Sequence, residues 1–348
     1  MFAVEPNAVQ LAWRGLGAGS RRVRIGAREV TIDAPAGAVV VDGLPAGREL
    51  VVLVDGCAVG SVHTLAPPPG GPLGRIATIS DRPIGERAIG RLPRIRSSHD
   101  DEQAQPLRCL RAAIAEAGAW GADRLVVKGD LTGESSPGSA APVLSTDVPG
   151  VRLILADSAT AGRDLGTTDG WADEVLQLAA EAPGPVLLVC HPYMHLPVRT
   201  HQPAGIPRRE AAPFLAKLGQ VNPASLVTSG HTRRIRRRSW GPVVTTEVGS
   251  TMDHPGTWAG YLVYEGGIVQ TVRRIMDPDV TEWTERTRRT ALGIRGLWSL
   301  GRLADRSFSH TWTMDIRRSV RVSHVASNAS PRRAVATRDR IGTPVPTR

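Results

Sequence analysis

The chain has 348 residues, of which 41% are hydrophobic and 22% charged, and its formal net charge is +10. Such values are typical of a globular protein with about two domains, and they exclude a fibrous or wholly disordered chain. No apolar run approaches the ~18 residues that a membrane-spanning helix needs, so we expect no membrane partner. No zinc-finger or other nucleic-acid-binding motif accompanies the positive charge, which we interpret as solvated arginine, and we do not expect nucleic acid as a partner.

The three cysteines, Cys57, Cys109 and Cys190, are far apart in the sequence. An odd and sparse set argues against a disulfide framework and fits a reducing compartment. Residues 1–6 contain no basic segment followed by an apolar core, so we expect no signal peptide. The sequence therefore predicts a cytoplasmic protein.

Residues 1–68 contain short alternating runs that are separated by Gly, Pro, Asp and Asn. This spacing predicts a small all-β sandwich domain. Within it, Leu11–Trp13, Gly43–Gly47 and His63–Leu65 resemble a fibronectin type III-like module, which implies a surface suited to a protein partner. The proline-rich segment 66–72 predicts a semi-rigid linker after this domain.

Four apolar segments farther along the chain each end in one side chain that can bind a metal ion. These side chains are Asp81 after 75–80, Asp130 after 125–129, His191 after 185–190 and His231 after 226–230. Ligands of open α/β folds gather at the carboxyl ends of strands, so four strands that end in this way predict a metal site.

The elements between these segments follow from hydrophobic spacing. Residues 107–117 carry apolar side chains at helical spacing between two strands, which predicts a βαβ unit with Asp81 and Asp130 at one sheet edge. We expect no strand in the Gly-, Ser- and Pro-rich segment 132–149. Further elements are expected as helices over 171–182 and near Phe214, as strands over 151–157, 243–248, 260–264 and 268–272, and as a C-terminal helix over 280–298.

In the order of these motifs, residues 74–275 resemble the calcineurin-like metallophosphoesterases. The resemblance implies an α/β fold, a four-layer αββα metallophosphoesterase-type sandwich, preceded here by the small all-β domain. We expect residues 276–312 to form a C-terminal helical extension. The basic tail 313–348 is poor in apolar residues, and we expect it to be disordered.

The resemblance also implies a metal site and roles for its residues. The family uses two divalent ions, and a mixed set of carboxylate and imidazole ligands suits Mn, Fe or Zn. By position, Asp130 matches the bridging carboxylate, Asp81 a ligand of the first ion, and His191 and His231 ligands of the second. Of these, Asp130 and His231 are the residues for which we expect catalytic roles.

Three departures from the family pattern concern the same site. Pro83 and Arg233 stand where the family has histidine ligands of the first ion, and its Gly-Asn-His block is absent. A guanidinium group cannot ligate a cation, so we expect one or two ions and at most one held well, by Asp130, His191 and His231. Arg233 and His195 are the residues that we expect to bind substrate, because Arg suits bidentate contact with phosphate.

The function predicted from these residues is that of a metal-dependent phosphoesterase, with activity weakened by the missing ligands. Its partner would be a phosphorylated small molecule or a phosphodiester, and the N-terminal β domain could bind a protein. One alternative is an inactive relative that binds a phosphate ligand or a protein partner. Another is a polyanion-binding protein that uses its arginine-rich C-terminal part. We interpret the arginines at 234–238 as a solvated strand edge.

Overall fold

The structure is a computed structural model of the whole chain, and it describes residues 1–80, 88–89, 94–97, 104–129, 143–160, 165–194 and 205–312. The chain divides into two compact units, Met1–Met314 and Asp315–Arg348. The tail 313–348, which the sequence predicts to be disordered, lies outside the described residues. In the described part of the chain, no helix combines the length and apolar character needed to cross a membrane.

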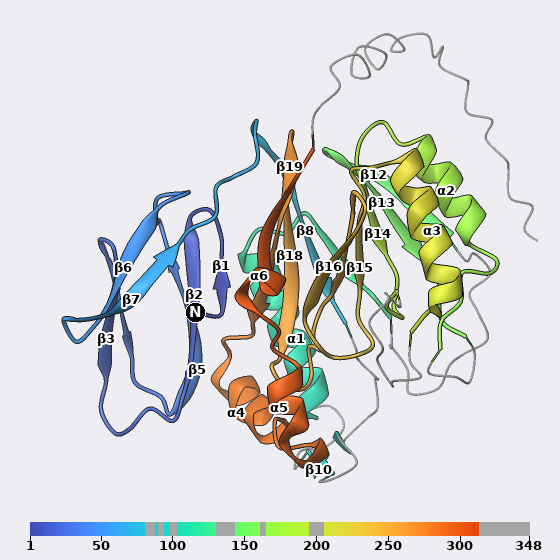
Figure 1. Cartoon of the computed structure of the whole chain (residues 1–348). Helices are drawn as coiled ribbons and strands as arrows, with labels where there is room; N and C mark the ends of the chain where they lie inside the picture. Colours follow the sequence, from blue (N-terminus) through green and yellow to red (C-terminus); the bar gives the residue numbers. More distant parts are fainter. Residues whose placement is uncertain are drawn as a thin grey trace, which may run out of the picture. The chain divides into compact units, whose positions relative to one another are not determined.

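The N-terminal part of the chain forms two antiparallel sheets, as predicted from its alternating runs (Figure 1). One sheet has the order β1 (Ala3–Val4), β2 (Ala8–Arg14) and β5 (Ala36–Asp42). The other has the order β4 (Arg28–Ile32), β3 (Arg21–Ile25), β6 (Glu49–Val54) and β7 (Cys57–His63). Val9, Ile25 and Val52 are buried in a core that both sheets share. The likeness of this part to a fibronectin type III module stays a prediction.

A five-stranded sheet, here called sheet I, contains the first of the strands predicted to end at the site. Its order is β11 (Arg124–Val127), β8 (Pro72–Ile79), β18 (Thr257–Tyr264), β19 (Gly267–Arg274) and β20 (Ser307–Thr311). β8 and β11 are parallel neighbours, and α1 (Gln105–Ala119) connects them in the chain. The predicted βαβ unit is therefore confirmed. Two short strands, β9 (Ala88–Ile89) and β10 (Ile95–Arg96), pair with each other.

A six-stranded sheet, here called sheet II, contains the strands that precede His191 and His231. Its order is β12 (Val143–Val148), β13 (Val151–Ala156), β14 (Val186–Val189), β15 (Leu226–Ser229), β17 (Val243–Glu247) and β16 (Arg236–Trp240). The four central strands are parallel, and β12 and β16 run antiparallel at the two edges. All four residues of β14 and of β15 are buried, which fits their uninterrupted apolar or small side chains.

Three clusters of buried side chains hold helices and sheets together. Sheets I and II face each other across a core that includes Ile76, Leu187 and Tyr261. Helices α1 and α4 (Pro278–Thr287) cover the other face of sheet I around Trp258. Helices α2 (Ala172–Ala180) and α3 (Arg208–Val221) cover sheet II around Leu215, and Figure 1 shows them side by side. The predicted α/β class is confirmed, and the layers run helix, sheet, sheet, helix.

Two segments differ from the sequence-based predictions. Strand β12 lies within 132–149, where we expected no strand; it is an edge strand whose residues 144–147 are exposed, so it needs little apolar sequence. The helix expected over 280–298 is divided into α4, the short turn η1 (Ala291–Gly293) and α5 (Ile294–Trp298), because Leu292 and Gly293 have φ of 55° and 84°.

The stretch predicted as a helical extension, 276–312, also contains α6 (Leu303–Arg306) and strand β20, which pairs with β19. The predicted domain limits themselves stay predictions.

Polar contacts join the first strands of the chain to sheet I. Glu5 Oε1 accepts from Arg273 Nε at 2.6 Å, and the Gln10 side chain bonds the backbone of Arg274 in both directions, at 2.7 and 2.8 Å.

Candidate functional site

The two strands of sheet I that precede Asp81 and Asp130 end at the same edge. Beyond the last paired residues of β8 and β11, the Lys128 amide still donates to the Ile79 carbonyl at 3.0 Å. The chain thus places both strand ends together, as the βαβ prediction required. Asp81, Asp130 and His195 themselves lie outside the described residues, so their predicted roles stay predictions.

The ends of β14 and β15 in sheet II meet the end of β11. A Cβ atom built on Gly129, which has φ of +126°, would lie 2.8 Å from His191 Cβ. The Gly230 amide donates to the His191 carbonyl at 3.0 Å. The rings of His191 and His231 stand edge to face, with centroids 5.2 Å apart and planes at 81°. The structure therefore brings the two predicted histidine ligands together, next to the residue before Asp130.

The loop that carries His231 has an unusual backbone. His231 and Arg233 both adopt left-handed conformations, with φ of 68° and 57°, which non-glycine residues rarely do. Two neighbouring residues, Thr232 and Arg234, hold this shape by binding Glu247. Thr232 Oγ1 donates to Glu247 Oε2 at 2.8 Å, and Arg234 donates to both carboxylate oxygens at 2.6 and 3.0 Å. Strain that is held in this way is a common feature of functional sites.

Arg234 corrects one expectation from the sequence. The arginines at 234–238 were interpreted as a solvated strand edge, yet the Arg234 side chain is only 2% exposed. Besides its carboxylate partner, the guanidinium lies over the rings of Tyr193 and Trp298, at 5.2 and 4.8 Å. A buried arginine needs such partners, and Glu247 is thirteen residues away in the sequence, so the spacing of the arginines alone did not reveal the pair.

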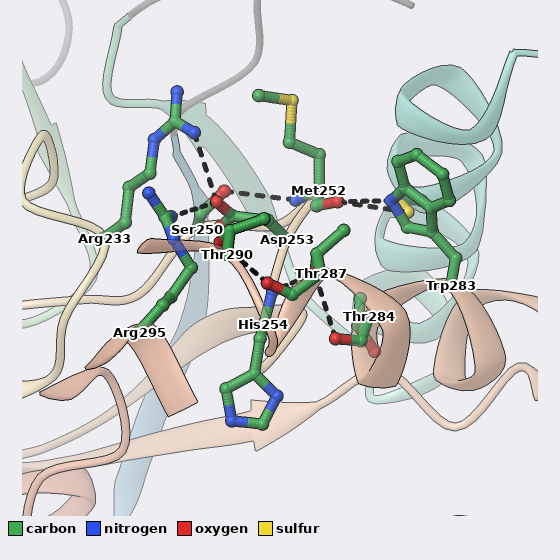
Figure 2. A network of polar contacts seen from close by, with 11 residues as sticks. Arg233, Ser250, Met252, Asp253, His254, Trp283, Thr284, Thr287, Thr290 and Arg295 are labelled. Atoms are coloured by element: carbon green, nitrogen blue, oxygen red, sulfur yellow. Dashed lines mark hydrogen bonds and ion pairs between the residues drawn. The ribbon is translucent and has the colours of Figure 1, made fainter. Parts of the chain in front are cut away.

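Arg233 is held by a buried carboxylate (Figure 2). Its Nη1 donates to Asp253 Oδ2 at 3.1 Å, and Arg295 Nη1 from α5 pairs with the same oxygen. The Asp253 side chain is completely buried, whereas each arginine is 22% exposed. Two guanidinium groups around one carboxylate leave this cluster with a net positive charge, and Arg233 belongs to the same loop as His231. Sequence analysis anticipated Arg233 but not Asp253 or Arg295, which come from segments without a recognisable motif.

The residues around Asp253 form a polar network against α4, which Figure 2 shows from close by. The Trp283 indole donates to the Met252 carbonyl at 2.8 Å, and the His254 amide donates to Thr287 Oγ1 at 2.9 Å. The His254 ring is 3% exposed, and burial lowers its pKa to about 4. At neutral pH this ring is therefore uncharged and adds no positive charge to the pair of arginines.

A buried lysine crosses between the two sheets just behind the site. Lys128 is 4% exposed, and its ammonium group donates to the Ser229 carbonyl at 3.0 Å and to Thr228 Oγ1 at 3.3 Å. Thr228 Oγ1 lies 2.6 Å from the Tyr261 hydroxyl, whose pKa burial raises to about 12. Sequence reasoning did not single out Lys128. The available indication was a charged residue at the end of an apolar strand, directly before Gly129.

The donor set present here fits a divalent metal ion in kind. Two imidazole groups that follow neighbouring parallel strands lie edge to face, and imidazole is a good ligand for Mn, Fe and Zn. Over the described ranges, no group of three His, Cys, Asp or Glu side chains is arranged to hold a metal ion. A complete site would therefore require a further ligand from the segments that follow Ser80 or Gly129.

A cavity of about 230 Å³ lies elsewhere in the fold. It is lined by Leu73, Arg75, Asp123 and Val148 among others, at the beginnings of β8 and β11. The histidine pair lies at the opposite ends of these strands. The cavity is therefore separate from the candidate site.

No family model and no curated protein matches the sequence. The fold is similar to solved structures, including a predicted phosphoesterase from Streptococcus pneumoniae, with 9% identity over 69% of this chain and 98% of that one and a TM-score of 0.32. GAP50, the anchor in the inner membrane complex of Plasmodium, has 10% identity, coverage of 60% and 87%, and a TM-score of 0.37. Vps29 from Entamoeba histolytica, complexed with Zn²⁺, has 12% identity, coverage of 59% and 94%, and a TM-score of 0.27.

Proposed function

We propose that the chain is a metallophosphoesterase-type protein that holds one divalent metal ion and hydrolyses phosphate esters slowly. The observation that supports this most directly is the pair of His191 and His231 at the ends of two strands, whose ring centroids lie 5.2 Å apart. The motif order in the sequence and the helix, sheet, sheet, helix layering support the four-layer fold of that family. Asp130 follows Gly129, which abuts His191, and completes the proposed ligand set.

In this proposal His191, His231 and Asp130 hold the ion, which is Mn, Fe or Zn. When bound, such an ion polarises a phosphoryl oxygen and lowers the pKa of a bound water molecule. Arg233 and His195 bind the substrate. The buried ammonium group of Lys128 adds a fixed positive charge next to the strand ends. Positive charge of this kind favours the approach of a phosphate ester.

The surroundings of Arg233 are the reason to propose one ion and slow turnover. Arg233 occupies a loop position where the resembled family has a ligand, and its Nη1 donates to Asp253 Oδ2 at 3.1 Å, which holds the guanidinium in place. A fixed positive charge repels a second metal ion nearby. Pro83 also has no side-chain atom that could ligate such an ion together with Asp81. Loss of a second ion removes much of the charge stabilisation that two-metal hydrolysis uses.

The same arginines favour a second candidate function, a phosphate-binding protein without turnover. Arg233 and Arg295 share one carboxylate, so the cluster keeps a net positive charge that suits an anionic ligand. The N-terminal sheets would then provide a surface that binds a protein partner, in the cytoplasm. This function needs no metal ion, which separates it from the first.

Metal content and turnover of the full chain test both candidates. After dialysis against Mn or Zn, we expect one ion per chain by plasma mass spectrometry, and slow hydrolysis of bis(p-nitrophenyl) phosphate. His231→Ala should lower the metal affinity by about 100-fold or more, since a directly bound ligand is lost. The matched control is His63→Ala, an exposed histidine on β7.

Three results discriminate between the candidates. Metal loss and activity loss in His231→Ala alone would support the one-ion phosphoesterase. Binding of inorganic phosphate without metal or hydrolysis would favour the binding protein. Two ions per chain, or hydrolysis that is equal in His231→Ala and wild type, would overturn the proposal.

A further inference from the structure

Three large apolar side chains protrude together from the segment around η1 and α5. Leu292, Ile294 and Leu297 are 83%, 61% and 83% exposed. Ile294 and Leu297 are three residues apart on α5 and therefore share one helix face, and Leu292 lies two residues before this helix, in η1. We call these three residues the apolar ridge. Three large apolar side chains exposed within six residues differ from the single, scattered apolar residues that are normal on protein surfaces, and such groups mark interaction surfaces.

The backbone under the apolar ridge is anchored from the inside. The Ser299 carbonyl accepts from the Ile235 amide at 2.8 Å, and Gly296 is buried against the Arg288 side chain. Trp298, on the same helix, lies 4.8 Å from the guanidinium of the buried Arg234. These contacts hold α5 against the loop after β15, so the exposure of the ridge does not arise from a helix end without contacts.

Arginines flank the ridge on both sides in the sequence. Residues 286–302 contain five arginines and no Asp, Glu or Lys; the arginines are Arg286, Arg288, Arg289, Arg295 and Arg302. Arg295 is paired with Asp253, whereas Arg286, Arg289 and Arg302 are exposed. Exposed apolar side chains that exposed arginines flank in the sequence match a surface with an apolar interior and a negative face, which is the arrangement of an anionic lipid bilayer.

We propose that the apolar ridge and its exposed arginines dock the protein on an anionic lipid surface. The ridge would enter the region between headgroups and acyl chains while Arg286 and Arg289 contact lipid phosphates. This departs from the expectation of no membrane partner, which depended on the lack of a spanning run; docking at the interface requires none. Because Arg295 of α5 shares Asp253 with Arg233, which follows His231 in the same loop, docking would also bring the candidate site towards the lipid surface.

Vesicle sedimentation with the full chain tests the proposal. We expect the wild type to bind vesicles of phosphatidylcholine mixed with phosphatidylglycerol, to bind pure phosphatidylcholine weakly, and to dissociate as salt is added. The double variant Leu292→Ser, Leu297→Ser should need about tenfold more lipid, because its apolar contacts are lost. Arg286→Gln, Arg289→Gln should weaken binding and its salt dependence.

The control is Leu144→Ser, which removes a side chain of 60% exposure on β12 and should bind as wild type. The basic tail is the same in every variant, so it cannot account for a difference between them. Unchanged melting temperatures show that the variants fold. The proposal is overturned if the wild type does not bind the anionic vesicles, or if the ridge variant binds them equally well. It is also overturned if the ridge substitutions change only the molar mass in solution, which would indicate a second copy of the chain as the partner.

Discussion

His254 is a titratable side chain with almost no access to water. Its ring is 3% exposed, and its Nδ1 lies 3.9 Å from Glu285 Oε1. That carboxylate is already paired with Arg274 at 2.7 Å. Burial therefore dominates and lowers the pKa of His254 to about 4 from 6.5. The folded protein keeps the ring neutral in a range of pH where the unfolded chain binds a proton.

This difference predicts a pH dependence of stability. Between pH 6.5 and about 4 the unfolded state binds more protons, so the free energy of unfolding should fall as the pH is lowered. The slope from this one group is at most about 1.4 kcal/mol per pH unit. Urea denaturation of wild type and His254→Gln at several pH values checks it: the variant should show a smaller slope. His63→Gln, an exposed position, should keep the wild-type slope, and equal slopes for all three would contradict the expectation.

Single residues show which parts of the site can be predicted from sequence. His191 and His231 each end an apolar run, and that pattern was sufficient to predict that their side chains meet. Asp253 and Lys128 could not be predicted in the same way. Their burial depends on Arg233 and Arg295 in one case and on Ser229 in the other, partners that only the folded chain brings near.

Gly129 shows how an element ending determines the site. At φ of +126° it occupies a backbone region that suits glycine, and its missing side chain leaves room for His191. The close approach of β11 to β14 therefore depends on a residue without a Cβ atom. A larger residue would have to displace the histidine ring or the strand end.

We expect Gly129→Ala to disturb the histidine pair. The added methyl group would lie 2.8 Å from His191 Cβ, so the ring must move, and metal affinity should fall about tenfold or more. Gly170→Ala is the matched control, because Gly170 also has positive φ, +80°, but meets no atom within 4 Å. The metal affinities of both variants can be measured from the rise of their melting temperatures as metal is added. Equal metal affinities in the two variants would exclude His191 as a ligand in contact with Gly129.

Central strands were predicted better than edge strands. β14 and β15 are buried on both faces, and their apolar or small side chains indicate it. β12 at one edge of sheet II contains Ser145, Thr146 and Asp147, all exposed, so no apolar pattern distinguished it from a loop. At the other edge, β16 was predicted as a solvated edge, but the preceding Arg234 is buried by its pairing with Glu247.

Across the whole molecule, the N-terminal sheets and sheet I are joined by buried polar contacts. Glu5 is 8% exposed and pairs with Arg273, which is 10% exposed, while Gln10 bonds the backbone of Arg274. Removing one member of a buried charge pair is costly, because the other charge is left without compensation. These contacts should make the two parts unfold together, although the sequence suggested separate domains with a linker.

Glu5→Gln tests this coupling. We expect the free energy of unfolding to fall by about 3 kcal/mol, because the Arg273 guanidinium loses its carboxylate in a buried position. Differential scanning calorimetry should show one transition in the wild type and a lower or divided transition in the variant. Glu29→Gln, at an exposed position on β4, should leave the curve unchanged. A wild type that already melts in two separate steps would contradict the coupling.

The strand order of sheet I also constrains how the protein is made. β8 is synthesised early, yet its neighbours are β11 and the much later β18, and β20 completes the edge near residue 311. On the ribosome, β8 emerges long before β18 has been translated. The edge of β8 that pairs with β18 therefore stays unpaired until then. Pairings that are so distant in sequence form slowly. We therefore expect a nascent chain of this protein to need chaperones that shield the unpaired edge of β8 until β18 has been translated.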